Sequence, residues 1–132
     1  MGNIKKVFVF GNPDVAVDAT PVELLPALRE RFPAIEFLFL DPNEEWEIPD
    51  PLLVIDTVMG IPGIHVFHGL DEFTKTPSIS VHDFDALSQL RLLKKLGKLG
   101  EVTIIGISPL LSMEEAKVKI SDSLSALLPI PQ

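Results

Sequence analysis

The sequence predicts an α/β fold: a single three-layer domain with a mostly parallel sheet, an antiparallel edge strand, and helices on both faces. Short runs rich in Val, Ile and Phe alternate along the chain with segments of helical periodicity. This alternation is typical of β-α-β units, in which strands become parallel neighbours. No repeat, low-complexity segment or change of composition divides the 132 residues, so one hydrophobic core and one domain are expected.

Apolar runs predict the strands of this sheet. The central run, residues 52–58, is apolar over most of its length, which predicts a strand buried on both faces. The run 64–67 follows the turn Gly60-Ile61-Pro62-Gly63, and we expect it to be an antiparallel strand at the edge. Further strands are predicted at about residues 4–10, 35–40 and 101–107.

Three segments have the pattern of helices. The first begins at Thr20-Pro21, where threonine suits the N-cap and proline the first helical position, and it ends at Pro33. The second covers Asp83 to Leu96, and the third runs from about Met113 to Leu127. In the second helix, periodicity places Phe84, Leu87 and Leu90 inward, and Arg91, Lys94, Lys95 and Lys98 largely outward.

The composition limits the function classes. The chain has 19 acidic and 11 basic residues, a formal net charge of −8, which argues against nucleic acid or an anionic membrane as a partner. It has no cysteine, which excludes disulfides, thiolate metal sites and a cysteine nucleophile. No apolar stretch is long enough to span a bilayer, and we recognise no signal peptide. We therefore expect a cytoplasmic protein.

Two acids and one histidine occupy similar positions relative to predicted strands. Asp18 follows the first strand and its Gly11-Asn12-Pro13 turn, Asp56 ends the run 52–55, and His82 follows the short run 78–81. Ligands of open α/β sheets bind at the carboxyl edge of the strands, where we expect these three side chains to converge. Two carboxylates and an imidazole there would suit a transition-metal or acid/base site.

Each of these residues also has a purely structural explanation. Asp18 could be a solvated loop acid near a helix start, and His82 could pack at a helix entry. Asp56 could cap the backbone of Thr57 or of nearby loops; as a carboxylate closing a buried run it needs a specific partner. His65 and His68 fall on or just after the predicted edge strand, and we expect both to lie outside the site.

Taken in order, these residues resemble the nickel–iron hydrogenase maturation endopeptidase family. The segments that carry the resemblance are Gly11-Asn12 with Asp18, Leu53-Val54-Ile55-Asp56, Ile79-Ser80-Val81-His82 and Gly106-Ile107-Ser108-Pro109. The resemblance implies a single domain of this type over residues 1–132. It also implies that Asp18, Asp56 and His82 are both the nickel ligands and the catalytic residues.

Members of that family remove a C-terminal extension from the hydrogenase large subunit after nickel has been inserted. The resemblance implies that the partner is this nickel-loaded precursor, which supplies the nickel as the recognition element. The metal could polarise the scissile carbonyl or activate water. One alternative is a non-catalytic metal-sensing or assembly protein that binds the precursor without cleaving it. Another is an α/β small-molecule binding domain in which the three residues never meet.

Overall fold

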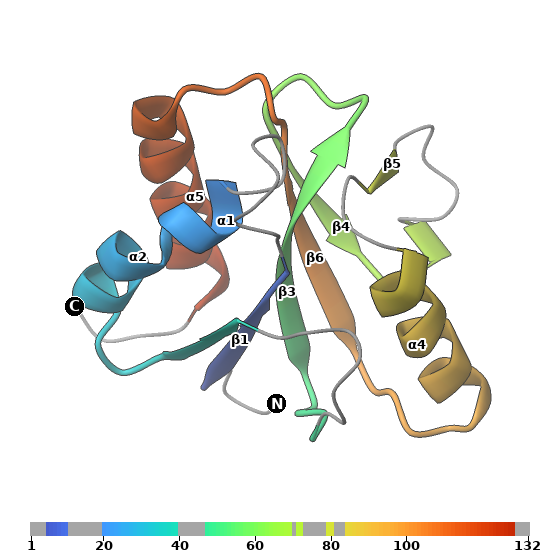
Figure 1. The fold of residues 1–132 in the computed structure, drawn as a ribbon. Coiled ribbons are helices and arrows are strands. Elements are labelled where there is room, and N and C mark those ends of the chain that lie inside the picture. The colour runs from blue at the N-terminus through green and yellow to red at the C-terminus, as the bar shows by residue number, and fades with distance from the viewer. Residues whose placement is uncertain are drawn as a thin grey trace.

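The computed structural model describes residues 5–10, 20–39, 47–69, 71–72, 79–80 and 84–128, with the backbone alone at residues 59, 79–80 and 84–89. Five strands form a sheet in the order β2-β1-β3-β6-β4, and β5 pairs with β3 outside this row (Figure 1). The strands are β1 (Lys6–Val9), β2 (Glu36–Phe39), β3 (Leu52–Met59), β4 (Ile64–His68), β5 (Ile79–Ser80) and β6 (Val102–Ile107). The helices are α1 (Thr20–Glu23), α2 (Leu25–Arg31), α4 (Phe84–Lys95) and α5 (Met113–Leu127).

The strand directions confirm the predicted sheet. β1 is parallel to both β2 and β3, and β3 is parallel to β6. β4 is antiparallel to β6 and lies at the end of the row, as expected from the tight turn that precedes it. The carboxyl ends of the four parallel strands therefore meet at one edge of the sheet.

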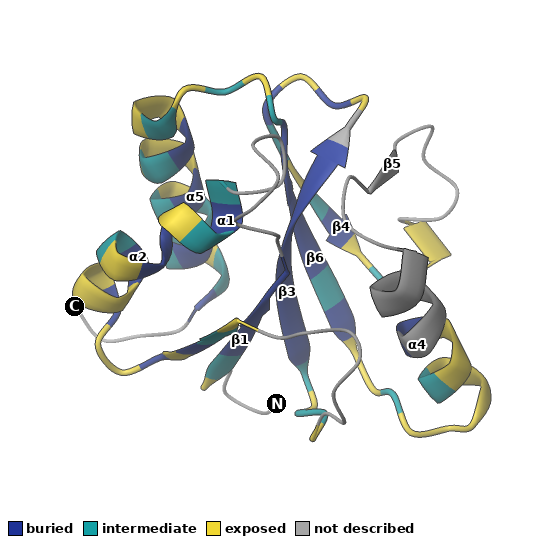
Figure 2. Ribbon diagram, in the orientation of Figure 1, coloured by how far each residue is buried: buried dark blue, intermediate teal, exposed yellow. Residues whose placement is uncertain are grey.

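The central strand β3 is buried from Leu52 to Val58 (Figure 2), and its alternating side chains belong to two different cores. Leu53 and Ile55 pack with side chains from α2 and α5 on one face. Leu52 and Val54 pack on the other face, in a cluster that includes Leu90 of α4. Successive residues of a strand point to opposite faces, so one apolar run supplies both cores and fixes the three layers.

Within the described residues, no helix is long and apolar enough to cross a membrane.

The prediction of one continuous helix after Thr20 is wrong, because the helix is interrupted at Leu24. Pro26 has no backbone N–H to donate to the carbonyl four residues earlier, so the ladder breaks and α2 starts anew at Leu25. Leu24 N still donates to Thr20 O at 3.1 Å, and Leu28 N donates to Leu24 O at 3.0 Å. Leu24 and Leu28 are nevertheless both almost fully buried, so the break does not interrupt the packing against the sheet.

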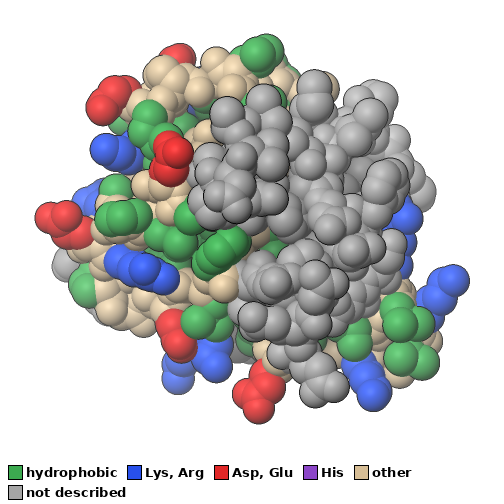
Figure 3. Space-filling view, in the orientation of Figure 1, with side chains coloured by type: hydrophobic (Ala, Val, Ile, Leu, Met, Phe, Trp, Pro, Cys, Tyr) green, Lys and Arg blue, Asp and Glu red, His purple; other side chains and the backbone are tan. Residues whose placement is uncertain are grey.

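The helix α4 lies on the opposite side of the sheet from α1, α2 and α5 (Figure 1). Leu90 is buried as predicted, and Arg91, Lys94, Lys95 and Lys98 are exposed as predicted. The side chains of Phe84 and Leu87, also predicted to point inward, lie outside the described part of the chain. At the lower right of the surface view, where Figure 1 places α4, basic and hydrophobic side chains lie side by side (Figure 3).

Gly106 of β6 allows close packing between the central strands and the edge strand. A Cβ atom at this position would lie 2.9 Å from Val58 Cγ2 and 3.1 Å from Phe67 Cε2. We expect Gly106→Ala to lower the free energy of unfolding by about 1–3 kcal/mol, because the core must shift to admit a methyl group. The control is Gly63→Ala, whose Cβ would meet only Lys119 Nζ at 3.5 Å. Equal losses in chemical denaturation would contradict the tight packing at Gly106.

A capping box starts the helix α5. The Ser112 hydroxyl accepts the Glu115 backbone N–H at 3.1 Å, and the Glu115 carboxylate accepts the Ser112 N–H at 3.3 Å. The hydrogen bond to the Ser112 backbone, followed by that to its side chain, lowers the pKa of Glu115 below its usual value of 4.5. The carboxylate form thus supports the helix start.

Removing this cap should destabilise the protein in a pH-dependent manner. We expect Ser112→Ala to lower the free energy of unfolding by about 1 kcal/mol near neutral pH. A carboxyl group whose folded pKa is lowered stabilises the fold above its unfolded pKa, and this contribution disappears as the pH falls through the folded pKa. Glu115→Ala removes the carboxylate that accepts the Ser112 backbone N–H, so in urea denaturation the deficit of this second variant should shrink below about pH 4.5. Ser125→Ala, within the same helix, is the control; a Glu115→Ala deficit that does not change with pH would refute the role of the Glu115 carboxylate.

Candidate functional site at the carboxyl edge of the sheet

Buried polar side chains gather at the carboxyl edge of β3 and β6. In the described part of the chain, the buried polar or charged residues are Asp56, Thr57 and Ser108, with 7%, 0% and 3% of their surface exposed. Asp56 pairs in register with Gly106, and Thr57 with Ile107. Ser108 directly follows Ile107, so the three residues belong to two neighbouring strand ends.

Asp56 lies inside β3 rather than at its end, because this strand continues to Met59. β1 bonds to β3 as far as Phe10, whose N–H donates to Ile55 O at 2.9 Å. Alternate residues of a strand direct their backbone groups to the same neighbour, so Thr57 presents its N–H on the β1 side of β3, as Ile55 does. The Asp56 Oδ1 atom accepts this N–H at 2.8 Å. The predicted structural role of Asp56 as a cap for Thr57 is therefore confirmed, and the bond orients the carboxylate.

Asp56 shares one face of the sheet with Gly106 and His65. Val54 and Val58 belong to the core on the α4 side, so Asp56 between them points to that side too. His65 pairs with Gly106 across the β4–β6 ladder, which makes Asp56, Gly106 and His65 one row across three strands. Two interstrand spacings separate the Cα atoms of Asp56 and His65 by about 10 Å.

His65 belongs to the edge of the molecule, as predicted, despite this shared row. Its side chain is 48% exposed, and its Nε2 atom lies 3.9 Å from Glu72 Oε1. Its ring packs against Phe67, with a centroid distance of 4.5 Å. Phe67 and Val58 fill the space above Gly106, between the acid and the histidine. His68, at the end of β4, is exposed as well.

Ser108 connects two loops at the same edge. Its N–H donates to Gly63 O at 2.7 Å, in the turn between β3 and β4. Its hydroxyl accepts the Leu110 N–H at 3.2 Å, in the loop that leads to α5. These bonds hold both loops in place beside β3. Thr57 points to the face opposite Asp56, and among the described residues its buried hydroxyl has no hydrogen-bond partner.

Two of the three predicted site residues, Asp18 and His82, lie outside the described residues. The short run before His82 contains β5, a two-residue strand antiparallel to β3. It pairs Ser80 with Val58, so the segment leading to His82 joins β3 two residues beyond Asp56. Within the described residues, no three His, Asp or Glu side chains could hold a metal ion together. The metal site formed by Asp18, Asp56 and His82 thus stays a prediction.

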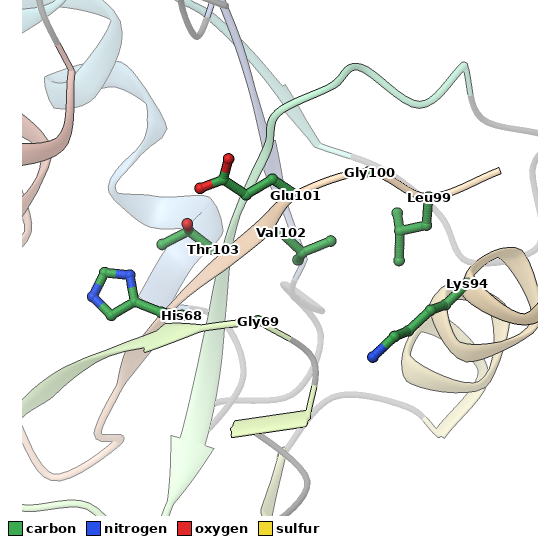
Figure 4. Close-up of a pocket in the computed structure, with 8 residues that line it drawn as sticks. All are labelled: His68, Gly69, Lys94, Leu99, Gly100, Glu101, Val102 and Thr103. Carbon is green, nitrogen blue, oxygen red and sulfur yellow. The ribbon is translucent and has the colours of Figure 1, made fainter. Parts of the chain in front are cut away.

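A separate hollow of about 230 Å³ lies at the opposite, amino edge of the sheet (Figure 4). It is lined by parts of β4, β6 and the end of α4, including His68, Lys94 and Thr103. Thr103 pairs with Leu53, three residues before Asp56 on β3. The Lys94 side chain extends toward this hollow, and its Nζ atom lies 2.8 Å from Asp71 Oδ1. Asp56 is not among the residues that line it.

Comparison with known proteins shows which fold this chain has. No protein-family model and no curated protein sequence matches the chain. The chain nevertheless has the fold of a hydrogenase maturation protease, as the sequence resemblance implies. The similar structure is the NiFe hydrogenase maturation protease HybD from Thermococcus kodakarensis, with a TM-score of 0.71 and 19% sequence identity. The match covers 95% of this chain and 99% of that chain.

The bond between Asp56 and Thr57 predicts how the fold responds to substitution of the acid. Asp56→Ala removes the acceptor and leaves the buried Thr57 N–H unpaired, so we expect a loss of about 1–3 kcal/mol in the free energy of unfolding. Asp56→Asn keeps an oxygen that can accept the same N–H, and it should be the less destabilised variant in thermal and urea denaturation. Equal stability of the two variants would show that this bond does not support the fold.

Proposed function

We propose that this protein is an endopeptidase that removes the C-terminal extension of a nickel-loaded hydrogenase large-subunit precursor. The observation that carries the proposal is the position of Asp56: a buried, oriented carboxylate at the carboxyl edge of a sheet with the fold of a hydrogenase maturation protease. Ligands of such sheets bind at this edge because its loops surround a crevice on a rigid scaffold. HybD is named as a hydrogenase maturation protease, which supports peptide hydrolysis as the reaction type. The shared fold supports a site at this edge of the sheet.

Asp18, Asp56 and His82 would contact the nickel ion that the precursor carries. Two carboxylates and one imidazole leave coordination positions for the precursor's own ligands and for water. The bond to Thr57 supports such a role for Asp56, since a metal-binding carboxylate needs a fixed direction. In the reaction, water adds to the scissile carbonyl, the C–N bond breaks, and a carboxylate and an amine leave. The nickel would serve for recognition and could also polarise that carbonyl.

The segment before His82 gives the proposal a second support. β5 joins β3 at Val58 and Met59, immediately past Asp56. His82 follows Ser80 by two residues, so its distance along the chain from this pairing is short. The protein would act in the cytoplasm on the precursor alone, without nucleic acid or membrane as partners.

The test is a cleavage assay on the purified nickel-loaded precursor, with product masses measured by mass spectrometry. We expect the wild type to release the C-terminal extension only from the nickel-loaded form. Asp56→Asn should retain its fold and lose activity by at least about a hundredfold, which corresponds to about 2.7 kcal/mol. The matched control is Asp122→Asn, the same change at an exposed position of α5, and it should cleave normally.

Two results would contradict the proposal in different ways. Full activity in folded Asp56→Asn would remove this residue from the site. Nickel-dependent binding of the precursor with no change in mass would instead identify the non-catalytic assembly protein. Absence of both binding and cleavage, with the protein folded, would leave only the similarity in fold.

A further inference from the structure

The outer side of α4 carries exposed leucines that the core does not use. Leu90 is 2% exposed and faces the sheet, whereas Leu92 and Leu96 are 55% and 57% exposed. Residues four apart lie on the same face of a helix, so Leu92 and Leu96 form one stripe directed away from the core. Polar residues normally cover the outer face of a helix that packs on a sheet. Packing within the domain therefore does not account for the two exposed leucines.

The end of α4 holds this stripe in a fixed geometry. Leu96 N donates to Leu92 O at 3.0 Å, which keeps the last turn helical. Gly97, with a φ of 72°, then closes the helix: Gly97 N donates to Lys94 O at 3.1 Å and Lys98 N to Leu93 O at 2.9 Å. This pair of bonds is a Schellman motif, which requires the left-handed conformation that glycine adopts readily. A binding partner would meet a preformed surface, so little ordering would be needed.

Basic side chains accompany the stripe in a chain that is otherwise strongly acidic. Arg91, Lys95 and Lys98 are exposed, and within the described residues none of them forms an ion pair. Lys94 differs, because it pairs with Asp71 and extends toward the hollow at the amino edge (Figure 4). Residues 86–100 contain no acid. The rest of the chain has seven basic and 19 acidic residues, which is a formal net charge of −12.

We propose that the α4 outer surface, formed by Arg91, Leu92, Lys95, Leu96 and Lys98, binds a segment of a partner protein. The segment would carry acidic side chains interleaved with bulky aliphatic ones, because these complement the cations and the leucines. Arg91 directly precedes Leu92 and Lys95 directly precedes Leu96, so cations and leucines are neighbours on this surface and one short segment can reach both.

The charge distribution favours a short polypeptide over an extended polyanion. Electrostatic interactions at physiological ionic strength extend about 8 Å, so a short segment on α4 senses mainly its cations. A membrane or a nucleic acid would approach more of the surface and meet the surplus of acids outside α4. The inference does not depend on the proposed peptidase activity, since Asp56 lies within the sheet and contributes nothing to this surface.

The test uses a synthetic helical peptide of about 18 residues, with leucine at helical spacing and glutamate elsewhere. We expect the fluorescently labelled peptide to bind the wild type in anisotropy titrations. Leu92→Ser/Leu96→Ser and Lys95→Glu/Lys98→Glu should each weaken binding by at least about tenfold, and added salt should reduce the effect of the charge reversal. The matched control is Val118→Ser/Lys119→Glu, an equivalent exposed pair on α5, which should bind like the wild type. Circular dichroism confirms that each variant is folded.

Several outcomes would overturn the proposal. Absence of peptide binding, or equal binding of a peptide in which serine replaces every leucine, would remove the specific role of the leucine stripe. An equal loss of affinity in the α5 control would show that the effect is one of overall charge. Tighter binding to phosphatidylserine vesicles or to single-stranded DNA would assign the surface to a polyanion. A dimer abolished by Leu92→Ser/Leu96→Ser would assign it to a second copy of the chain.

Discussion

The burial of β3 on both faces is the constraint on which the rest of this structure depends. A strand in the middle of a parallel sheet can carry a carboxylate only if that carboxylate has a partner, since an unpaired buried charge costs several kcal/mol. In β3 that partner includes the next residue's own backbone N–H, at the place where β1 no longer bonds to β3. The same bond therefore satisfies the buried Thr57 N–H and orients the Asp56 carboxylate.

The loops at this edge are connected to the sheet in a comparable way. Ser108 bonds through its backbone to Gly63 and through its hydroxyl to Leu110, so one buried residue links the turn after β3 to the loop before α5. The capping box at Ser112 then fixes the start of α5 only a few residues later. These bonds hold two loops in fixed positions beside β3.

Periodicity and turn chemistry were sufficient to predict the layers, the buried central strand and the antiparallel edge strand. They were not sufficient for features that depend on residues distant in the sequence. The row of Asp56, Gly106 and His65 is an example, since strand register is set by pairing and not by local preference. The break at Pro26 was visible in the sequence, but the strong leucine periodicity around it concealed the missing hydrogen bond.

A few short motifs indicated this fold although no family model matches and the identity to HybD is only 19%. The reason lies in which positions a fold restricts. Cores accept many apolar substitutions that preserve volume and pattern, so most positions of the sheet retain little sequence information. Buried polar positions are more restricted, because a polar residue there must satisfy both burial and backbone geometry, as Asp56 does. The order of such positions along the chain can therefore indicate a fold where overall identity is low. It does not identify the chemistry, because one fold can serve many reactions. The chemistry depends on whether the oriented carboxylate of Asp56 meets a metal ion at this edge.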